Sequence, residues 1–314
     1  MKCLVTGATG FIGEALCREL RARGDEVIQT SLHGASLADG SATTPIDLAI
    51  NDLAPGLLTG VDTVFHLAGI AHNRAAAERY EQVNFGATAR LAAAASTAGV
   101  RRFIFLSSVK AMGPALTDEE RTEGDVVAAT DDYGRSKWDA ECALRAMGDD
   151  AGMTIIILRP ALVYDTDAKG NLALLSSVVR RGLPRPPQGG ARSMIARGDL
   201  VSLLLALSGL EFQGAETWIA TDGEQYTTRR IYDALCRAHG VEPGRDWLPR
   251  WCWLAGARLR DLVRASPGST TADKLFGSER YSNAALLAAT GWRPRLTLED
   301  VLVADSPPAG DRAL

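Results

Sequence analysis

The pair Tyr133 and Lys137 is the clearest candidate for chemistry in the sequence. It lies in DDYGRSKWDAE, residues 131–141, where a spacing of four places both side chains on one face of a helix. Only five of the 34 lysines and arginines are lysine, so lysine at this place is notable. A phenol exchanges protons poorly near neutral pH unless its anion is stabilised, and a neighbouring ammonium stabilises it. The pair therefore predicts proton transfer by Tyr133, with Lys137 lowering the pKa of the phenol.

A glycine-rich turn lies near the start of the chain. LVTGATGFIG places Gly7, Gly10 and Gly13 between an apolar, strand-like run and an amphipathic helix. One glycine allows a tight turn, one lets backbone amides approach a pyrophosphate, and one lets the helix pack closely on the sheet. The helix N-terminus also attracts negative charge. The segment therefore predicts a dinucleotide site, in which Phe11 and Ile12 are further candidate contacts.

The TGxxGxxG turn together with YxxxK resembles the extended short-chain dehydrogenase/reductase family, which contains NAD(P)-dependent epimerases, dehydratases and sugar reductases. The resemblance covers nearly the whole chain. It implies a catalytic triad of Ser108, Tyr133 and Lys137, because Ser108 lies 25 residues before the tyrosine, as in that family. Ser108 would orient the substrate oxygen, Tyr133 would transfer the proton, and the nicotinamide would transfer hydride.

The resemblance also implies a cofactor, NAD or NADP, and the residues that contact it. These are Asp47 and Leu48 after the third strand, Leu67, Ala68 and Gly69 at the end of the fourth, Asn84 in the central helix, and Pro160 in the sixth strand. Ser31 stands where NAD-selective members carry an aspartate for the ribose hydroxyls. No arginine stands next to Ser31 to hold a 2′-phosphate. The choice between the two dinucleotides stays open.

Two later segments are similar to the substrate-binding segments of nucleotide-sugar enzymes. Asn171 and Leu172 in KGNLALL match a diphosphate-contacting pair, and Arg192 in RSMIARGDL matches an arginine that faces a phosphate. An arginine can hold a phosphate through two parallel hydrogen bonds. From the residues alone, Asn171 is equally compatible with a helix cap and Arg192 with a solvated loop charge.

Departures from the family patterns narrow the choice between the reactions that the family performs at C4 of such a sugar. Val109 and Lys110 follow Ser108 where sugar dehydratases carry an Asp-Glu pair, and this disfavours dehydration. Leu162 stands where UDP-galactose 4-epimerases usually carry asparagine. RFIFLSSVK, YGRSKWDAE and LRPALVY are similar instead to a subgroup used in bacterial surface-polysaccharide assembly, which includes reductases of UDP-4-keto sugars. This resemblance implies a 4-keto-sugar reductase of surface-polysaccharide precursor synthesis, with a UDP-glucose or UDP-GlcNAc 4-epimerase as the alternative. A non-catalytic dinucleotide sensor is a second alternative, disfavoured because Tyr133 and Lys137 are both present.

Composition restricts the partners and the location. The 314 residues carry a net charge of −4, with a pI near 5.7, so the whole chain has no general attraction to nucleic acid or anionic lipid. MKCLVTGATG leaves no room for a signal peptide, and no apolar run approaches the roughly 20 residues of a membrane span. Scattered cysteines and four histidines predict neither disulfides nor a metal site. We expect a cytoplasmic enzyme that binds a nucleotide sugar and forms a homodimer, as relatives often do.

Strand-like runs alternate with helical patterns through the first half of the chain. The strands are expected at 2–6, 26–30, 61–69, 101–108, 153–160 and 217–220, and the helices at 11–23, 74–98, 133–147, about 171–182 and 198–209. Short apolar strands separated by helices predict an α/β fold with a doubly wound parallel sheet. This Rossmann domain would span 1–162 and about 193–222, and a smaller, mostly helical substrate lobe would comprise 163–192 and 223–305. Residues 306–314 would be a flexible tail, and the tryptophans in RDWLPRWCWLAG an amphipathic helix of the lobe.

Overall fold

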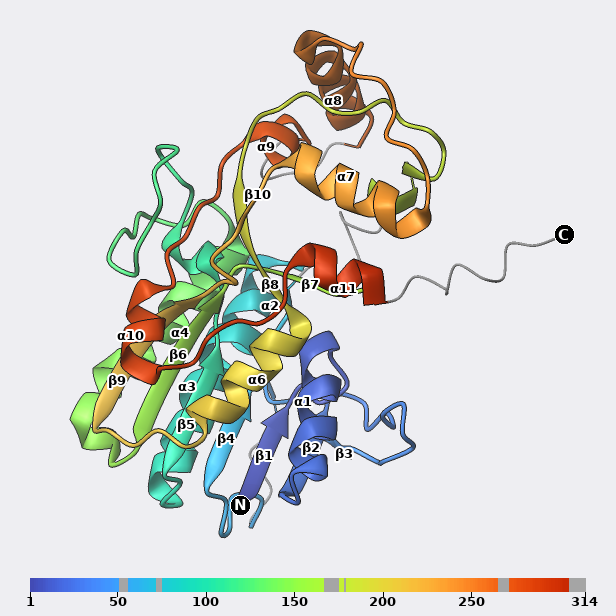
Figure 1. The fold of residues 1–314 in the computed structure, drawn as a ribbon. Coiled ribbons are helices and arrows are strands. Elements are labelled where there is room, and N and C mark those ends of the chain that lie inside the picture. Colours follow the sequence, from blue (N-terminus) through green and yellow to red (C-terminus); the bar gives the residue numbers. More distant parts are fainter. Residues whose placement is uncertain (51–55, 72–74, 167–174, 178, 265–270, 305–314) are drawn as a thin grey trace, which may run out of the picture.

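A parallel sheet forms the centre of the computed structural model, which describes the chain except residues 51–55, 72–74, 167–174, 178, 265–270 and 305–314 (Figure 1). Its strand order among the described residues is β3-β2-β1-β4-β5-β6-β9, with all neighbours parallel. The strands are β1 (Lys2–Thr6), β2 (Glu26–Ser31), β3 (Thr44–Pro45), β4 (Thr63–His66), β5 (Arg102–Leu106), β6 (Thr154–Pro160) and β9 (Gly214–Ala220). The predicted doubly wound fold is confirmed.

Helices cover both faces of this sheet because its strands are apolar on both sides. One face packs against α1 (Phe11–Ala22) and α6 (Arg197–Leu207), in a core that includes Val5, Leu16 and Leu204. The other face packs against α3 (Ala87–Thr97) and α4 (Asp132–Met147), in a core that includes Leu4 and Leu144. Consecutive residues of β1 thus face opposite layers, as the two-residue period of a strand requires.

The helix predicted over 74–98 is interrupted by a π-helical turn. In the described residues it begins as α2 (Ala77–Tyr80), widens into η1 (Glu81–Gly86) and continues as α3. Single π turns inside α-helices occur often at functional sites, because the wider turn displaces a side chain from its normal position. Asn84, one of the predicted cofactor contacts, lies in this turn.

The second lobe is mostly helical, as the sequence predicts, and it also contains a small sheet. Its strand order is β10 (Gln225–Tyr226), β8 (Arg192–Ala196) and β7 (Leu162–Tyr164). β8 was expected in the Rossmann domain, but it pairs with β7 and β10 instead. Its side chains explain the ambiguity: Ile195 packs into the core of the large sheet, whereas Met194 and Ala196 pack into the core of the lobe.

The C-terminal part of the chain also divides differently from the prediction. The lobe contains α7 (Thr228–His239), α8 (Arg250–Arg264), α9 (Thr271–Phe276) and α11 (Leu298–Ala304), whereas α10 (Ala284–Thr290) returns to the large sheet, where Leu286 is fully buried. Two short 3₁₀ helices, η2 (Val109–Met112) and η3 (Gly148–Ala151), follow β5 and α4. The helix expected near 171–182 and the tail at 306–314 lie partly or wholly outside the described residues. Within the described residues, no helix has the length and apolar composition needed to cross a membrane.

Candidate active site

The glycine turn connects β1 to α1 at the carboxyl edge of the sheet. Gly7 has φ +70°, and a Cβ there would lie 2.8 Å from the amide nitrogen of Ala68. A Cβ on Gly13 would lie 2.2 Å from the carbonyl oxygen of Gly7, and one on Gly10 would lie 3.1 Å from the same oxygen. Each position therefore needs a residue without a side chain for the turn to stay compact.

The same turn fits the pyrophosphate of a dinucleotide. Gly10 is the N-cap of α1 and provides no side-chain cap. The first amides of a helix have no acceptor within the helix, so those that follow Gly10, at Phe11, Ile12 and Gly13, are oriented toward an anion beyond the helix end. The predicted dinucleotide would be held here, and it would supply a nicotinamide that accepts or donates hydride.

A buried histidine connects β1, β4 and α3 behind this turn. Thr88 donates its hydroxyl hydrogen to the carbonyl oxygen of Asn84 at 2.7 Å, so its oxygen must accept from Nε2 of His66, 2.9 Å away. Nδ1 of His66 then accepts from the Thr6 hydroxyl at 2.7 Å, and that hydroxyl accepts from the amide of Ala68 at 3.2 Å. Burial lowers the pKa of His66 to about 3, so the ring is neutral. The network fixes the predicted cofactor loop at residues 67–69.

The π turn holds the other side of that loop. The amide of Ile70 donates to Oδ1 of Asn84 at 2.8 Å, and Nδ2 of Asn84 donates to the Ile70 carbonyl at 3.1 Å and to Oγ of Ser136 at 3.0 Å. A Cβ on Gly69 would lie 3.0 Å from Oδ1 of Asn84 and 3.3 Å from Nζ of Lys137. The loop that the sequence assigns to the cofactor is thus in contact with α4, which carries Tyr133 and Lys137 of the predicted triad.

The triad residues come together at the ends of β5 and α4. Asp131 caps α4 by accepting from the amide of Gly134 at 2.8 Å, which fixes the first turn where Tyr133 lies. Ser108, the N-cap of η2, accepts from the amide of Lys110 at 3.2 Å, and its hydroxyl lowers the pKa of Tyr133. Lys137 donates to the Leu106 carbonyl at 2.9 Å. The structure therefore brings together the three residues that the sequence predicts, although their catalytic roles stay predictions.

Burial controls the acidity of both catalytic candidates on α4. It raises the pKa of Tyr133 to about 12, against the hydrogen bond with Ser108, which lowers it. It also lowers the pKa of Lys137 to about 8, against the carboxylate of Glu141, which raises it. We expected Lys137 to make the phenol more acidic, but in this structure burial has the larger effect on Tyr133. Of the charges that act on that phenol, Asp131 raises the pKa further.

A buried ion pair below the triad was not predicted from the sequence. Arg159 and Glu141 are 1% and 0% exposed, and Nη2 of Arg159 lies 2.6 Å from Oε2 of Glu141. Ser107 donates its hydroxyl to Oε1 of Glu141 at 2.5 Å, so the pair connects α4 and β6 to the end of β5. The available signal was spacing, since Glu141 follows Lys137 by four residues and Tyr133 by eight.

The remaining predicted cofactor residues lie at the ends of strands. Ser31 ends β2, and Pro160 ends β6. Asp47 lies after β3, where its Oδ2 is 3.4 Å from Nη2 of Arg79, and the carbonyl of Leu48 accepts from Arg90 at 2.7 Å. Parallel strands end at the same edge of a sheet, which is where open α/β sheets bind ligands.

The predicted substrate residues are only partly described. Asn171 and Leu172 lie outside the described residues. Arg192 begins β8, opposite Tyr226 of β10, and forms a second strand bridge to Glu279. Burial lowers the pKa of Arg192, while Glu279 raises it. Nζ of Lys110, two residues after Ser108, lies 2.5 Å from Oε1 of Glu279. Glu279 is therefore next to both Arg192 and the segment that follows Ser108.

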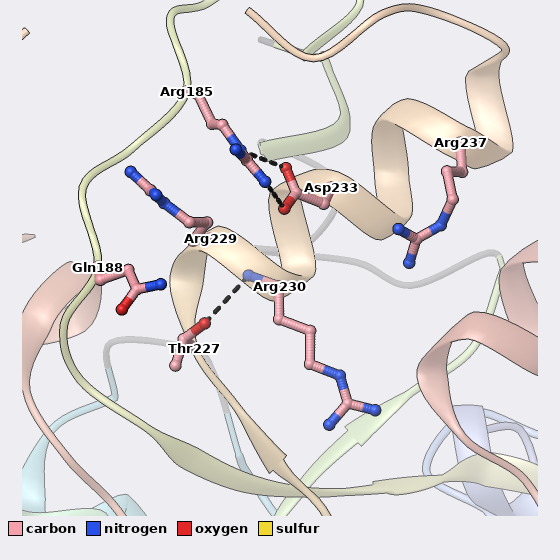
Figure 2. Close-up of a pocket in the computed structure, with 7 residues that line it drawn as sticks. All are labelled: Arg185, Gln188, Thr227, Arg229, Arg230, Asp233 and Arg237. Carbon is pink, nitrogen blue, oxygen red and sulfur yellow. Dashed lines mark hydrogen bonds and ion pairs between the residues drawn. The ribbon is translucent and has the colours of Figure 1, made fainter. Parts of the chain in front are cut away.

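A cavity of about 370 Å³ in the second lobe is lined by other residues (Figure 2). Its lining consists of Arg185, Gln188, Thr227, Arg229, Arg230, Asp233 and Arg237. Figure 2 shows Arg185 directed at Asp233, to which it is bonded at 2.5 and 2.8 Å. Arg230 is bonded to Glu299 at 2.9 Å, and Arg229 is paired with Asp246. Carboxylates of the lobe thus compensate these arginines, and the cavity contains none of the predicted site residues.

Comparison with known proteins shows the family of the chain. The model of the NAD dependent epimerase/dehydratase family matches residues 3–192, so the chain belongs to that family. It is 29% identical to a UDP-glucose 4-epimerase of Vibrio cholerae over 311 residues, which cover 95% of this chain and 92% of that protein. It is also 29% identical to a ceramide reductase of Caulobacter vibrioides over 302 residues, which cover 92% and 85%.

The fold is similar to that of MoeE5 in complex with UDP-glucuronic acid and NAD, with a TM-score of 0.75, 25% identity, and coverage of 96% of both chains. Membership of the family confirms an NAD(P)-dependent enzyme of the extended short-chain dehydrogenase/reductase type. The predicted nicotinamide dinucleotide is confirmed at the level of the family.

Proposed function

We propose that this enzyme is an NAD-dependent 4-epimerase of a UDP-sugar. The observation that carries the proposal is the placement of Tyr133 and Lys137 on α4 next to η2, whose N-cap is Ser108, at the sheet edge that also carries the glycine turn. The similarity to a UDP-glucose 4-epimerase along 95% of the chain supports the same function. It makes the epimerase, which the sequence placed second, the better supported reading.

The residues of the site divide the chemistry between them. Tyr133, as phenolate, would take the proton of the C4 hydroxyl, and Ser108 would donate a hydrogen bond to the oxygen on which charge develops. Bound NAD would supply the hydride chemistry, accepting the C4 hydrogen and giving it back. After the 4-keto sugar has rotated, so that its opposite face is presented, Tyr133 would return its proton to the oxygen. Atoms and electrons balance without a second substrate.

The end of β2 supports NAD rather than NADP. The Ser31 hydroxyl is hydrogen-bonded to Oγ1 of Thr43 at 2.6 Å and accepts from the amide of Gly34 at 3.0 Å. The residues at this turn, SLHGASL at 31–37, include no lysine or arginine. A 2′-phosphate is normally held by a cation at this place, so its absence disfavours NADP. MoeE5, which has a similar fold, was seen with NAD.

Arg192 supports a nucleotide diphosphate as part of the substrate. It lies on the strand that joins the two cores, and its carboxylate neighbour Glu279 is shared with Lys110 next to the triad. A diphosphate bound here would accept paired hydrogen bonds from Arg192 and would neutralise its positive charge. The sugar would then extend toward Ser108 and Tyr133.

The test is to incubate the purified protein with UDP-glucose, UDP-N-acetylglucosamine and UDP-glucuronic acid in D₂O, without added reductant. We expect one of them to form its C4 epimer, detected by NMR, with the C4 hydrogen retained because it leaves and returns as hydride. Tyr133→Phe serves as the inactive control. Failure of all three sugars to epimerise, or deuterium at C4, would contradict the proposal.

A 4-keto-sugar reductase, which the sequence favoured, is the second candidate. It is supported by the missing acidic residue at Ser31 and by the similarity to a ceramide reductase over 92% of the chain. A reductase consumes one NADH or NADPH per 4-keto substrate, whereas an epimerase shows no net consumption. Stoichiometric loss of absorbance at the reduced nicotinamide band with a UDP-4-keto sugar would establish the reductase in place of the epimerase.

A further inference from the structure

The outer face of α8 is apolar where it meets solvent. Trp251 and Leu259 are 69% and 65% exposed, Ala255 between them is also exposed, and Trp247 just before the helix is 67% exposed. Trp251, Ala255 and Leu259 follow one another at intervals of four, so they form a stripe along one side of the helix, about 12 Å long. We call Trp247, Trp251, Ala255, Arg258 and Leu259 the α8 outer face.

The inner face of the same helix is occupied by contacts within the lobe. Ala257 is buried, and Asp261 accepts from the backbone amide of Thr271 at 2.9 Å and from its hydroxyl. An ordinary surface helix buries its apolar stripe and exposes its charges. In α8 the carboxylate of Asp261 makes contacts within the lobe, whereas Trp251 and Leu259 face solvent. The packing of the chain therefore explains one face of this helix and leaves the other without a partner among the described residues.

The charges next to the outer face are mostly arginine. Arg258 lies within it and Arg245 is exposed two residues before Trp247, with Glu242 as an exposed carboxylate in the same segment, whereas Arg250 lies on the inner side, with its guanidinium 5.2 Å from the ring centre of Phe276. The two nearby aspartates are both engaged, Asp246 with Arg229 and Asp261 with Thr271. A local positive charge thus accompanies the apolar stripe, although the whole chain has a net charge of −4.

We propose that the α8 outer face binds the surface of an anionic lipid bilayer, with the helix parallel to the membrane plane. Tryptophan is favoured at the boundary between headgroups and acyl chains because its ring is apolar and its N–H is polar. Leucine contributes apolar area, and arginines pair with anionic headgroups. Trp251, Leu259 and Arg258 on one side of this 15-residue helix, with the exposed Trp247 just before it, have the chemistry of an interfacial helix.

The position of α8 allows this contact without obstructing the site. In Figure 1 the helix lies at the end of the second lobe that is farthest from β1 and β2, well away from the glycine turn. None of the residues of the outer face belongs to the predicted triad or to the predicted cofactor contacts. The proposal is therefore independent of which sugar reaction the enzyme performs.

Sedimentation of the full chain with vesicles tests the proposal. We expect binding to vesicles of 70% phosphatidylcholine and 30% phosphatidylglycerol, and weak binding to phosphatidylcholine alone. Trp251→Ser/Leu259→Ser should reduce the partition coefficient at least about tenfold because the buried apolar area is lost. Arg245→Gln/Arg258→Gln should remove most of the preference for the anionic vesicles.

A matched control replaces exposed apolar residues elsewhere. Ile50→Ser/Leu116→Ser removes two side chains that are 74% and 75% exposed and should leave binding unchanged. Thermal unfolding of every variant, which should match the wild type, separates a lost surface from a lost fold. The proposal is overturned if the wild type does not bind anionic vesicles, or if the α8 variant binds as well as the wild type. It is equally overturned if the α8 variant only converts a dimer to a monomer, since the face would then bind a second copy.

Discussion

At the scale of the residue, Tyr133 combines a raised pKa with a position that suits proton transfer. Burial raises its pKa to about 12, so the phenol is protonated near neutral pH, and Ser108 is the hydrogen-bonding group that opposes this shift. Lys137, whose pKa is lowered to about 8, is bonded to the Leu106 carbonyl. When bound, the positively charged nicotinamide ring of NAD would favour the phenolate.

Tyr133→Phe tests the proton transfer. The variant keeps the ring and its packing against Tyr80, 6.3 Å away between ring centres, but removes the hydroxyl. We expect turnover to fall by about 10²–10⁴-fold with NAD affinity nearly unchanged. Rates come from the epimerisation assay, and affinity from titration of bound dinucleotide. Tyr80→Phe should retain most of the activity, and a Tyr133→Phe enzyme of equal rate would remove Tyr133 from the mechanism.

Lys137→Arg tests whether charge alone is sufficient. The ammonium lies 4.6 Å from the ring centre of Phe105 and close to Gly69, a space too narrow for a planar guanidinium. We expect a loss of at least about tenfold in kcat/KM. Lys137 loses its proton as the pH rises through about 8, so wild-type activity should fall above pH 8, and the residual activity of the variant should not. Lys2→Arg, at a surface ion pair with Glu26, is the control.

At the scale of the element, the β1–α1 turn and the β1–β4–α3 contact determine where the cofactor loop lies. The turn depends on close backbone packing, since Gly7 and Gly13 leave no space for a Cβ. The contact depends on His66, which is fully buried between Thr6 and Thr88. Both features belong to connections between elements, where small displacements would move the predicted NAD site.

Gly13→Ala should distort the turn. The added Cβ would lie 2.2 Å from the Gly7 carbonyl, so α1 must move away from β1. We expect NAD affinity to fall by at least about tenfold and the unfolding free energy to fall by about 1–3 kcal/mol. Isothermal titration and urea unfolding measure the two effects. Gly256→Ala in α8 meets no atom within 4 Å and should be neutral or stabilising by about 0.5–1 kcal/mol.

His66 should make folding sensitive to acid. Its pKa is about 3 in the folded protein and near the ordinary 6.5 when unfolded, so below pH 6.5 only the unfolded chain takes up the proton. The contribution is therefore complete above pH 6.5 and is lost as the pH falls toward 3. From pH 7 to 5 this residue should lower the unfolding free energy by about 2 kcal/mol.

The variant His66→Asn should be less stable at pH 7, because one hydrogen bond is lost, and should have a flatter pH dependence. Urea unfolding at pH 7, 6 and 5 gives both quantities. His33→Asn, at an exposed histidine, should leave the pH dependence as in the wild type. An unchanged slope in His66→Asn would show that other groups cause the acid sensitivity.

At the scale of the whole molecule, β8 and Asp199 are two of the connections that hold the second lobe on the Rossmann domain. β8 contributes Ile195 to one core and Met194 to the other. Asp199, at the start of α6 and 3% exposed, accepts from the amides of Arg295 and Leu296, each at 2.9 Å. This carboxylate attaches the segment that leads from α10 to α11, so it fixes the return of the chain between the two lobes.

Asp199→Ala should loosen that return. Two backbone amides would lose their acceptor, and we expect the unfolding free energy to fall by about 2–4 kcal/mol. Limited proteolysis should then cut near residues 291–297 faster than in the wild type. Asp132→Ala, whose partner Arg135 is on the exposed surface of α4, should change stability by less than about 1 kcal/mol. Equal protease resistance in Asp199→Ala would contradict this role.

Much of the architecture and of the candidate site could be predicted because it is encoded locally. The TGxxGxxG spacing, the strand and helix periods and the Tyr133–Lys137 interval each depend on residues within one or two turns of each other. These patterns predicted the doubly wound sheet, which is confirmed, and they predicted residues that the structure brings together at one edge. The reaction was harder to predict, because reductases and epimerases share the same groups.

The sequence by itself therefore determined that the sheet is parallel and doubly wound, where the dinucleotide turn lies, and which residues form the candidate triad. Only the tertiary structure decided that β8 joins a second sheet, that α10 returns to the first, and that Glu141 pairs with Arg159 beneath Ser107. It also decided that Trp251 faces outward. The physical reason is that a local period states which residues share a face, whereas the partner of that face depends on packing between segments far apart in the chain.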